Sequence, residues 1–378
     1  MYHVKTMNKI SKIGLAELDD RFEISDTMEH EDAILVRSAK LHDYDFPAEL
    51  KCIARAGAGV NNIPLDRAAD AGIVVFNAPG ANANGVKELT IAALLLASRK
   101  ISQGITWVKE QSAAGADVAA VVEKGKSAYV GPEIMGKTLG VVGLGAIGVL
   151  VANAAAALGM KIVGYDPFLS VTHALNLTPG VEVVDTLPEL YAKADYISLH
   201  LPMNDATRGT LNEAAFAAMK DGVRIVNLAR GELVDTPALK AALDSGKCAA
   251  YVTDFPNSET AAIEGVVAIP HLGASTPESE DNCAMMAARE VKEYLDNGSI
   301  INSVNLPNLT MAWAAKTRVC VISKGADAAA IAGAVPAVAS ASNTRGEYAY
   351  TILDTDAAVD EAAIAAIPGV LRVRVLTR

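Results

Sequence analysis

The chain contains a glycine pattern that could bind a dinucleotide. A GxGxxG sequence lies between a predicted strand at 138–142 and a predicted helix at 149–158. Its glycines are Gly143, Gly145 and Gly148. Such glycines allow a tight turn, a close backbone approach to a pyrophosphate, and close packing of the helix, whose N-terminus faces the phosphates. Asp166 follows the next predicted strand, 161–165, where an acid can hold ribose hydroxyls and repel a 2′-phosphate. The pattern predicts a site that prefers NAD over NADP.

Candidate acid–base and anion-binding residues follow other predicted strands. Oxidation of an alcohol beside a carboxylate needs a base for the hydroxyl proton and a cation for the carboxylate. His271 follows the predicted strand 266–269, and its imidazole can exchange a proton near neutral pH. Arg230 follows the predicted strand 224–227, and its guanidinium could bind a carboxylate through two hydrogen bonds. Glu259 could orient the His271 ring. Position alone leaves a purely structural role open for each of them.

Composition and charge limit the class of protein. The chain has 378 residues, of which 51 % are hydrophobic and 20 % charged, which excludes disordered and fibrous classes and allows two or three domains. Aromatic residues are only 5 %, so small aliphatic side chains must fill the core, as in helices packed on buried parallel strands. The net charge of −11 disfavours nucleic acid and anionic lipid surfaces as partners.

Cysteine spacing and apolar runs exclude further classes. The four cysteines form no CxxC pair and have no histidine at metal-ligand spacing, so we expect buried free thiols and no metal site. No apolar run approaches the roughly 20 residues of a membrane span. The first ten residues do not resemble a secretory signal. We therefore expect a cytoplasmic protein without a membrane span.

Strand and helix patterns alternate along most of the chain and predict an α/β fold with parallel sheets. A first region has predicted strands at 33–37, 52–55 and 73–76, with a helix at 65–70. A second region has predicted strands at 138–142, 161–165, 196–200, 224–227, 249–253 and 266–269. One long helix is predicted from about 86 to 111, as a bridge between domains, and another at 277–295.

The pattern changes after Met311 to that of a small α+β module. The predicted strands there are 318–323, 348–354 and 370–376. Residues 325–342 are half alanine, which leaves open whether they form a helix or a poorly specified connector.

Several motifs together resemble those of the D-2-hydroxyacid dehydrogenase family. They are NLARGELVD around Arg230, PHLGAST around His271, the acids Asp254 and Glu259, and GLGAIG with Tyr165-Asp166-Pro167. The resemblance covers about residues 30–308. It implies two doubly wound Rossmann-like lobes of the formate/glycerate dehydrogenase type.

The resemblance also implies a role for each candidate residue. His271 would take the C2 hydroxyl proton while hydride passes to NAD, Glu259 would hold His271, and Arg230 would bind the substrate carboxylate or carbonyl oxygen. The implied cofactor-binding residues are Ala78, Gly143, Gly145, Ala146, Ile147, Gly148, Asp166, Leu201, Leu228, Ala229, Arg230, Asp254, His271, Gly273 and Ala274.

The chain departs from the family pattern at two places near the site. Ala78 stands where many relatives have threonine, so one hydroxyl contact to the cofactor is missing. Thr260 stands where proline usually follows the glutamate, and the segment 259–271 is short. The geometry of this loop is therefore less defined by the resemblance than the identities of its residues.

A phosphorylated substrate requires a local cation in this acidic chain. Arg55 ends the predicted strand 52–55 and opens AGAGVNN, whose backbone N–H groups could cradle an anion. The implied substrate-binding residues are Arg55, Ala56, Gly57, Ala58 and Gly59. Lys87 and Arg99 are weaker candidates. Three longer motifs, ARAGAGVNNI, NAPGANANGVKELT and PHLGASTPESEDNCA, resemble family members that act on phosphorylated 2-hydroxy acids.

We therefore predict an NAD-dependent enzyme that oxidises a phosphorylated 2-hydroxy acid. Another D-2-hydroxyacid dehydrogenase, of the glyoxylate, hydroxypyruvate or D-lactate reductase type, is the first alternative. A nucleotide-sensing binding protein without activity is the second, although the complete set of Arg230, Glu259 and His271 argues against it. The expected partners are a small-molecule substrate and further copies of the chain, in a homodimer or homotetramer.

The predicted domains are a discontinuous substrate-binding lobe at 1–88 and 284–310, an NAD-binding domain at 89–283, and a tail at 314–378. SNTRGEYAYTILDTD and GVLRVRVL in the tail resemble the regulatory ACT domain. KGADAAAIAG lacks the proline of the usual effector loop, and the segment looks too short for a full helix plus strand. We therefore expect the tail to serve assembly rather than regulation.

Overall fold

The computed structural model describes all residues from Met1 to Arg378 and divides them into two compact units. Unit 1 contains Met1–Asn82 and Pro277–Arg378, and unit 2 contains Ala83–Thr276. The domain boundaries expected from the sequence, near residues 88 and 283, fall inside the helices α3 (Ala83–Ser98) and α11 (Pro277–Asn297). Each of these helices belongs as a whole to one unit. No helix of the protein is both long enough and apolar enough to cross a membrane.

Unit 1 is built on a five-stranded parallel sheet with the strand order β2-β1-β3-β4-β5. The strands are β1 (Tyr2–Met7), β2 (Phe22–Ser25), β3 (Ala33–Val36), β4 (Cys52–Arg55) and β5 (Val74–Asn77). The helices beside it are α1 (Lys12–Leu15), α2 (Leu65–Asp70) and α11. Every residue of β3 is buried, as expected for a parallel strand covered on both faces. The sequence analysis missed β1 and β2.

Unit 2 is built on a seven-stranded parallel sheet with the order β12-β11-β10-β9-β6-β7-β8. Its strands are β6 (Thr138–Val142), β7 (Lys161–Tyr165), β8 (Glu182–Val183), β9 (Tyr196–Leu199), β10 (Val223–Asn227), β11 (Cys248–Thr253) and β12 (Val266–Ala268). The helices beside it are α3, α6 (Ala146–Ala157), α7 (Val171–Leu175), α8 (Leu187–Lys193), α9 (Glu213–Ala218) and α10 (Thr236–Asp244). The strand order reverses between β6 and β9, which is where ligands bind in doubly wound sheets.

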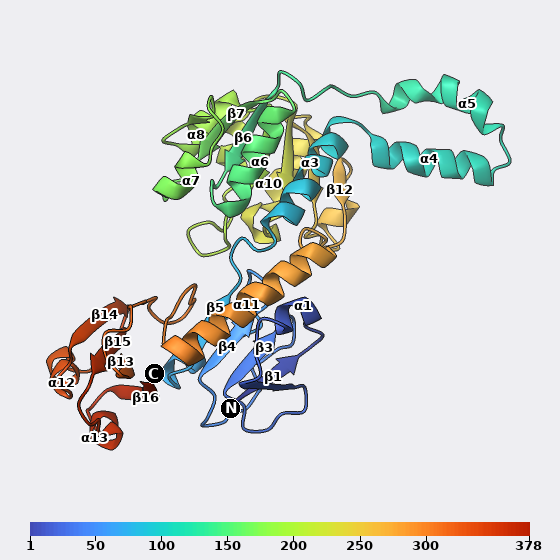
Figure 1. Ribbon diagram of the computed structural model, residues 1–378. Helices are drawn as coiled ribbons and strands as arrows, with labels where there is room; N and C mark the ends of the chain where they lie inside the picture. The colour runs from blue at the N-terminus through green and yellow to red at the C-terminus, as the bar shows by residue number, and fades with distance from the viewer. The chain divides into compact units, whose positions relative to one another are not determined.

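The long helix expected at 86–111 is instead two helices, α3 and α4 (Ile101–Ala113). Gly131 passes so close to the last turn of α3 that a Cβ there would lie 2.0 Å from the carbonyl oxygen of Ser98. The chain turns away at this point. The segment 101–129, called the arm below, comprises α4, α5 (Val118–Gly125) and a short 3-10 turn, and none of its three elements buries a residue. The arm extends away from the rest of unit 2 (Figure 1).

The tail forms a four-stranded antiparallel sheet with the order β14-β15-β13-β16. Its elements follow one another as β13 (Thr317–Lys324), α12 (Ala328–Gly333), β14 (Ala339–Arg345), β15 (Tyr348–Thr355), α13 (Glu361–Ala365) and β16 (Val370–Thr377). The alanine-rich segment therefore holds a strand and a helix of only six residues, which agrees with the expectation that it is too short for a full helix plus a strand. A helix of six residues leaves enough chain for β14.

The two faces of the tail sheet pack against different partners. Along β13, Val319 and Val321 pack with Ile331 of α12 and Ile364 of α13. The alternate residues, including Cys320, belong to the core that α11 and the parallel sheet of unit 1 also form. Because side chains alternate between the faces of a strand, one strand serves both cores. The tail is thus part of unit 1, next to α11 in Figure 1.

Two buried arginines of the tail bind the carboxyl end of α11. Arg374 donates to the carbonyl oxygens of Tyr294 and Leu295 at 3.0 and 2.8 Å. Arg318 donates to the carbonyl oxygen of Asn297 at 2.9 Å and binds both carboxylate oxygens of Asp354 at 2.7 and 2.9 Å. The last carbonyls of a helix lack intrahelical partners and carry partial negative charge. The guanidinium groups supply hydrogen-bond donors to these carbonyls.

A buried carboxyl group lies further along the same helix. Glu290 is 6 % exposed, and its Oε1 accepts a hydrogen bond of 2.7 Å from the side chain of Asn302. Its Oε2 is buried without a partner. Burial raises the pKa of Glu290 to about 8, and only the Asn302 bond acts in the opposite direction. Glu290 is therefore protonated at neutral pH.

We predict that Glu290 makes the protein less stable as the pH rises. Folded Glu290 keeps its proton up to about pH 8, whereas the unfolded chain releases it near pH 4.3, so the free energy of unfolding falls across this window. The slope from this group is about 1.4 kcal/mol per pH unit. Glu290→Gln should remove it, as measured by chemical unfolding at pH 5, 6.5 and 8. Glu293→Gln, one turn away, is the control. Parallel pH profiles for Glu290→Gln and the wild type would contradict the prediction.

Candidate active site

The GxGxxG turn leaves open space at the start of α6. Gly143 has a φ of +95°, and a Cβ there would lie 2.7 Å from the carbonyl oxygen of His200. A Cβ at Gly148 would lie 1.9 Å from the carbonyl oxygen of Gly143. Both positions therefore require glycine. At Gly145 a Cβ would meet no atom within 4 Å, so the helix N-terminus beside it is accessible to a phosphate.

Asp166 is held at the carboxyl end of β7 by two backbone groups. Its Oδ2 accepts a hydrogen bond from Leu144 N, and its Oδ1 accepts one from Phe168 N, both at 2.9 Å. The first of these bonds connects the acid to the glycine turn. Each carboxylate oxygen keeps a further lone pair, which can accept from a ribose hydroxyl.

Asp254, directly after β11, has an unpartnered buried oxygen. The residue is 1 % exposed, its Oδ2 accepts from Gly273 N at 3.1 Å, and its Oδ1 has no partner. Burial raises the pKa of Asp254, while the Gly273 N–H and the nearby His271 lower it. A carboxamide N–H₂, such as that of nicotinamide, could supply the missing bond. The glycine turn, Asp166 and Asp254 therefore fit a nicotinamide dinucleotide.

The side chains of Arg230 and His271 both lie against the ring of Phe255. The centroids of the Phe255 and His271 rings are 4.3 Å apart with an interplanar angle of 45°. The guanidinium carbon of Arg230 lies 5.2 Å from the centre of the same Phe255 ring. His271 is exposed, and Arg230 is half-buried. A proton-exchanging group and a cation thus lie on one aromatic side chain at the carboxyl edge of the sheet.

The backbone around Arg230 is fixed by Asn227, the last residue of β10. Asn227 is fully buried, and its Oδ1 accepts from the backbone N–H groups of Ala229 and Arg230 at 3.1 and 3.3 Å. Its Nδ2 donates to the carbonyl oxygen of Arg230 at 2.8 Å. Arg230 is therefore positioned by the strand end.

The structure does not bring Glu259 to His271. Glu259 is exposed at the start of the 3-10 turn η3 (Thr260–Ala262), and its backbone N–H donates to Asn257 Oδ1 at 3.0 Å. No hydrogen bond or ion pair joins its carboxylate to the His271 ring. Asn257 also binds the backbone and hydroxyl of Thr260, the residue that replaces the usual proline. Aromatic contact with Phe255, rather than the expected carboxylate, holds the His271 ring.

The remaining predicted cofactor residues differ in burial and in the unit to which they belong. Within unit 2, Leu201 packs 3.3 Å from the Cβ position of Gly143, and Leu228 is 7 % exposed. Ala146 and Ile147 begin α6, Ala229 lies just after β10, and Ala274 lies in the turn between β12 and α11. Ala78 belongs to unit 1, where it is fully buried and its N–H donates to the carbonyl oxygen of Gly57 at 3.0 Å.

The predicted phosphate site in unit 1 contains a second arginine. Arg55 ends β4, and its Nε donates to the carbonyl oxygen of Arg37, which follows β3, at 3.0 Å. The Arg55 side chain folds over Gly57, where a Cβ would lie 2.6 Å from Nη1. The N–H groups of Ala56 and Gly57 are already bonded to Val36 and Arg55 carbonyls. Of the four loop residues proposed as an anion cradle, Ala58 and Gly59 have no such backbone bond.

Sequence reasoning missed three residues of these sites: Arg37, Asn227 and Phe255. Arg37 was counted as the end of a strand, although β3 and β4 are parallel neighbours and Val36 pairs with Arg55. This adjacency could have predicted that Arg37 lies beside Arg55. Phe255 directly follows Asp254, but nothing in the local sequence shows that His271 and Arg230 meet its ring.

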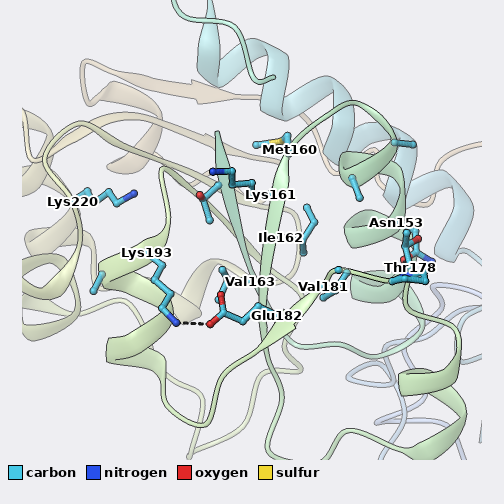
Figure 2. A pocket seen from close by; sticks show the side chains of 16 residues that line it. Asn153, Met160, Lys161, Ile162, Val163, Thr178, Val181, Glu182, Lys193 and Lys220 are labelled. Atoms are coloured by element: carbon cyan, nitrogen blue, oxygen red, sulfur yellow. Dashed lines mark hydrogen bonds and ion pairs between the residues drawn. The ribbon is translucent and has the colours of Figure 1, made fainter. Parts of the chain in front are cut away.

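A large cavity of unit 2 lies away from these residues. Its volume is about 810 Å³, and it is lined by the first residues of β6 and β7, Thr138 and Lys161, and by Lys193, whose Nζ is 2.5 Å from Glu182 Oε1 (Figure 2). These are the amino-terminal ends of parallel strands, opposite the edge that carries the glycine turn. The cavity is therefore not the cofactor site.

Residues 91–273 match the family described as D-isomer specific 2-hydroxyacid dehydrogenase, NAD binding domain. This range includes the glycine turn, Asp166, Arg230, Asp254 and His271. Residues 91–273 are therefore an NAD-binding domain of this family, and NAD is the cofactor that the domain binds. The fold and cofactor expected from the sequence are confirmed.

Relatives and solved structures agree with this assignment. The chain is 36 % identical over 315 residues to D-3-phosphoglycerate dehydrogenase of Methanocaldococcus jannaschii, covering 81 % of this chain and 58 % of that protein. A glyoxylate reductase from Paecilomyes thermophila is 28 % identical with a TM-score of 0.67, covering 80 % and 98 % of the two chains. NAD-bound 3-phosphoglycerate dehydrogenase of Entamoeba histolytica is 26 % identical with a TM-score of 0.63, covering 82 % and 99 %. The chain spans 53 to 60 % of the length of the first curated relatives.

We predict that Asp166→Ala weakens NADH binding and reduces the preference over NADPH. Losing hydrogen bonds to a charged group costs about 1.5–3 kcal/mol, which corresponds to a roughly 10- to 100-fold higher KM for NADH. The like charge that repels a 2′-phosphate also disappears, so the KM for NADPH should fall. Asp185→Ala, at an exposed acid of the same unit, is the control. Equal use of NADH and NADPH by the wild type would contradict this role of Asp166.

Proposed function

We propose that the protein is an NAD-dependent D-3-phosphoglycerate dehydrogenase, which oxidises D-3-phosphoglycerate to 3-phosphohydroxypyruvate and thereby supplies serine biosynthesis. The observation that carries the proposal is the meeting of Arg230 and His271 on Phe255 at the edge of an NAD-binding domain. The name of the curated relatives and the arginine pair of unit 1 support the phosphorylated substrate.

In the proposed mechanism, His271 acts on the C2 hydroxyl of the substrate, and Arg230 acts on its carboxylate or carbonyl oxygen. When bound, NAD supplies the hydride acceptor. Imidazole Nε2 or Nδ1 of His271 takes the C2 hydroxyl proton, and the face of the Phe255 ring stabilises the imidazolium that results. Arg230 binds the substrate carboxylate or carbonyl oxygen and offsets charge that develops on it. Glu259 remains a candidate for orienting His271, for which its exposed side chain must reach the ring.

Unit 1 would bind the phosphate group through its arginines. Arg37 follows β3, and Arg55 ends the neighbouring parallel strand β4, so both side chains start from the carboxyl edge of the sheet. Guanidinium groups bind phosphate oxygens with two parallel hydrogen bonds. Ala58 and Gly59 would add backbone N–H groups. The chain carries a net charge of −11, so this local pair of cations would provide the attraction for an anionic substrate.

The proposal predicts NAD reduction with 3-phosphoglycerate and a much smaller kcat/KM with glycerate and D-lactate. Arg55→Ala should raise the KM for 3-phosphoglycerate at least tenfold, a loss of about 1.4 kcal/mol or more, and change that for glycerate little. NADH formation at 340 nm measures both, with and without serine. Arg99→Ala, at a weaker candidate cation, is the control. Equal losses for both substrates would remove the phosphate role of Arg55, and His271→Ala with full activity would overturn the mechanism.

A second candidate function is reduction of an unphosphorylated 2-keto acid. The likeness to a glyoxylate reductase, with a TM-score of 0.67, favours it. It shares Arg230, His271 and the cofactor site with the first proposal but does not use Arg37 or Arg55. A higher kcat/KM for glyoxylate or hydroxypyruvate than for 3-phosphohydroxypyruvate, measured with NADH, would select it.

We also propose that the protein is a homodimer or homotetramer assembled through the arm. Ile101, Ile105 and Val108 of α4 are 38, 52 and 37 % exposed and share one helix face. Isolated helices shorter than about 12–15 residues are marginally stable in water, so a second copy would supply the surface that the arm lacks. Light scattering should give a multiple of 39.3 kDa, and Ile105→Asp should lower the mass. A monomeric wild type would overturn this proposal.

We also propose that the enzyme is located in the cytoplasm. Its four cysteines are free thiols, which fit a reducing compartment. A cell fractionation that finds the protein elsewhere would contradict it.

A further inference from the structure

Glu280 of α11 forms an ion pair with Arg37, one of the two arginines of the proposed phosphate site. Arg37 Nη2 lies 2.7 Å from Glu280 Oε1. Arg55 Nε is bonded to the backbone of Arg37, so the two arginines and the glutamate lie at one corner of the sheet. Cys283 lies on the next turn of α11, and all three charges affect the pKa of its thiol. Burial raises the pKa of its thiol to about 11, while Arg55 and Arg37 lower it and Glu280 raises it further.

The charge of this corner is too small for a phosphate monoester. Two guanidinium groups and one carboxylate sum to a single positive charge, whereas a phosphate monoester carries about −1.5 to −2 at neutral pH. Glu280 is held there because it lies in the first turn of the 21-residue helix α11, where the helix dipole favours an acid. The ion pair is nevertheless open to exchange, since the Arg37 and Glu280 side chains are 40 and 44 % exposed.

We propose that Glu280 is a placeholder for the phosphate group of the substrate and thereby a specificity-determining residue. Its carboxylate occupies Arg37 until a phosphate monoester replaces it. An exposed ion pair is weak, and a two-point pair between arginine and phosphate is stronger, so the exchange favours the substrate. The competition raises the KM for phosphorylated substrates and the inhibition constant of free phosphate. Substrates without a phosphate do not compete with Glu280. This inference rests on the proposed function for its substrate, but not for its anion chemistry.

The test compares Glu280→Gln with Glu278→Gln. Both residues are exposed acids in the first turn of α11, and only Glu280 reaches Arg37. Glutamine keeps the shape of the side chain and removes its charge. Glu280→Gln should lower the KM for 3-phosphoglycerate and the inhibition constant of inorganic phosphate by about twofold to fivefold, the range that an exposed ion pair supports. The KM for glycerate should stay the same, and Glu278→Gln should change all three constants by less than about 1.5-fold, because Glu278 does not pair with Arg37.

Calorimetric titration of inorganic phosphate separates this proposal from the proposed function, because it needs no turnover. If the wild type does not oxidise 3-phosphoglycerate, the proposed function fails, while tighter phosphate binding by Glu280→Gln than by Glu278→Gln still supports the placeholder. Equal phosphate affinity in the two variants would overturn the placeholder, whatever the substrate. So would phosphate binding that Arg37→Ala leaves unchanged in both the wild type and Glu280→Gln.

Discussion

Unit 1 depends on the burial of two positive charges at the carboxyl end of α11. A buried guanidinium is costly unless it is paired and hydrogen-bonded. Arg318 meets this condition through Asp354, and Arg374, which is 6 % exposed, meets it through the carbonyls at the end of the helix. The helix end needs hydrogen-bond donors and the buried arginines need acceptors, so the same hydrogen bonds satisfy both groups. The tail sheet, α11 and the parallel sheet therefore form one core, and the tail is a structural part of unit 1.

The chemistry of both units is concentrated at the carboxyl ends of parallel strands. In unit 1 these ends carry Arg37 and Arg55, and in unit 2 they carry Asp166, Arg230 and Asp254. A parallel sheet brings all such ends to one edge, so residues far apart in sequence become neighbours there. Because α11 runs from this edge of unit 1 to the tail, one helix carries Glu280 at one end and the arginine-capped carbonyls at the other.

Two features of the candidate sites concern charge. His271 is held by the ring of Phe255 and lies near the buried Asp254, while Glu259 remains in solvent. At the corner of unit 1 that holds Arg37 and Arg55, Glu280 halves the positive charge that these two arginines supply. In an acidic chain, small changes in the number of local charges can decide which anions bind. Both features thus set the local charge around Arg37, Arg55 and His271.

The sequence alone determined the glycine turn, most of the strands, the NAD site and the identities of Arg230 and His271, because these depend on local patterns and specific motifs. Tertiary structure decided the rest. The break after α3 lies beside Gly131, which crosses the last turn of this helix, and the place of the tail depends on the contacts of Cys320 and Arg374 with α11. These contacts join residues distant in sequence, and no local periodicity encodes them. For the same reason, only the folded chain shows that Phe255 holds His271 and that Glu280 occupies Arg37.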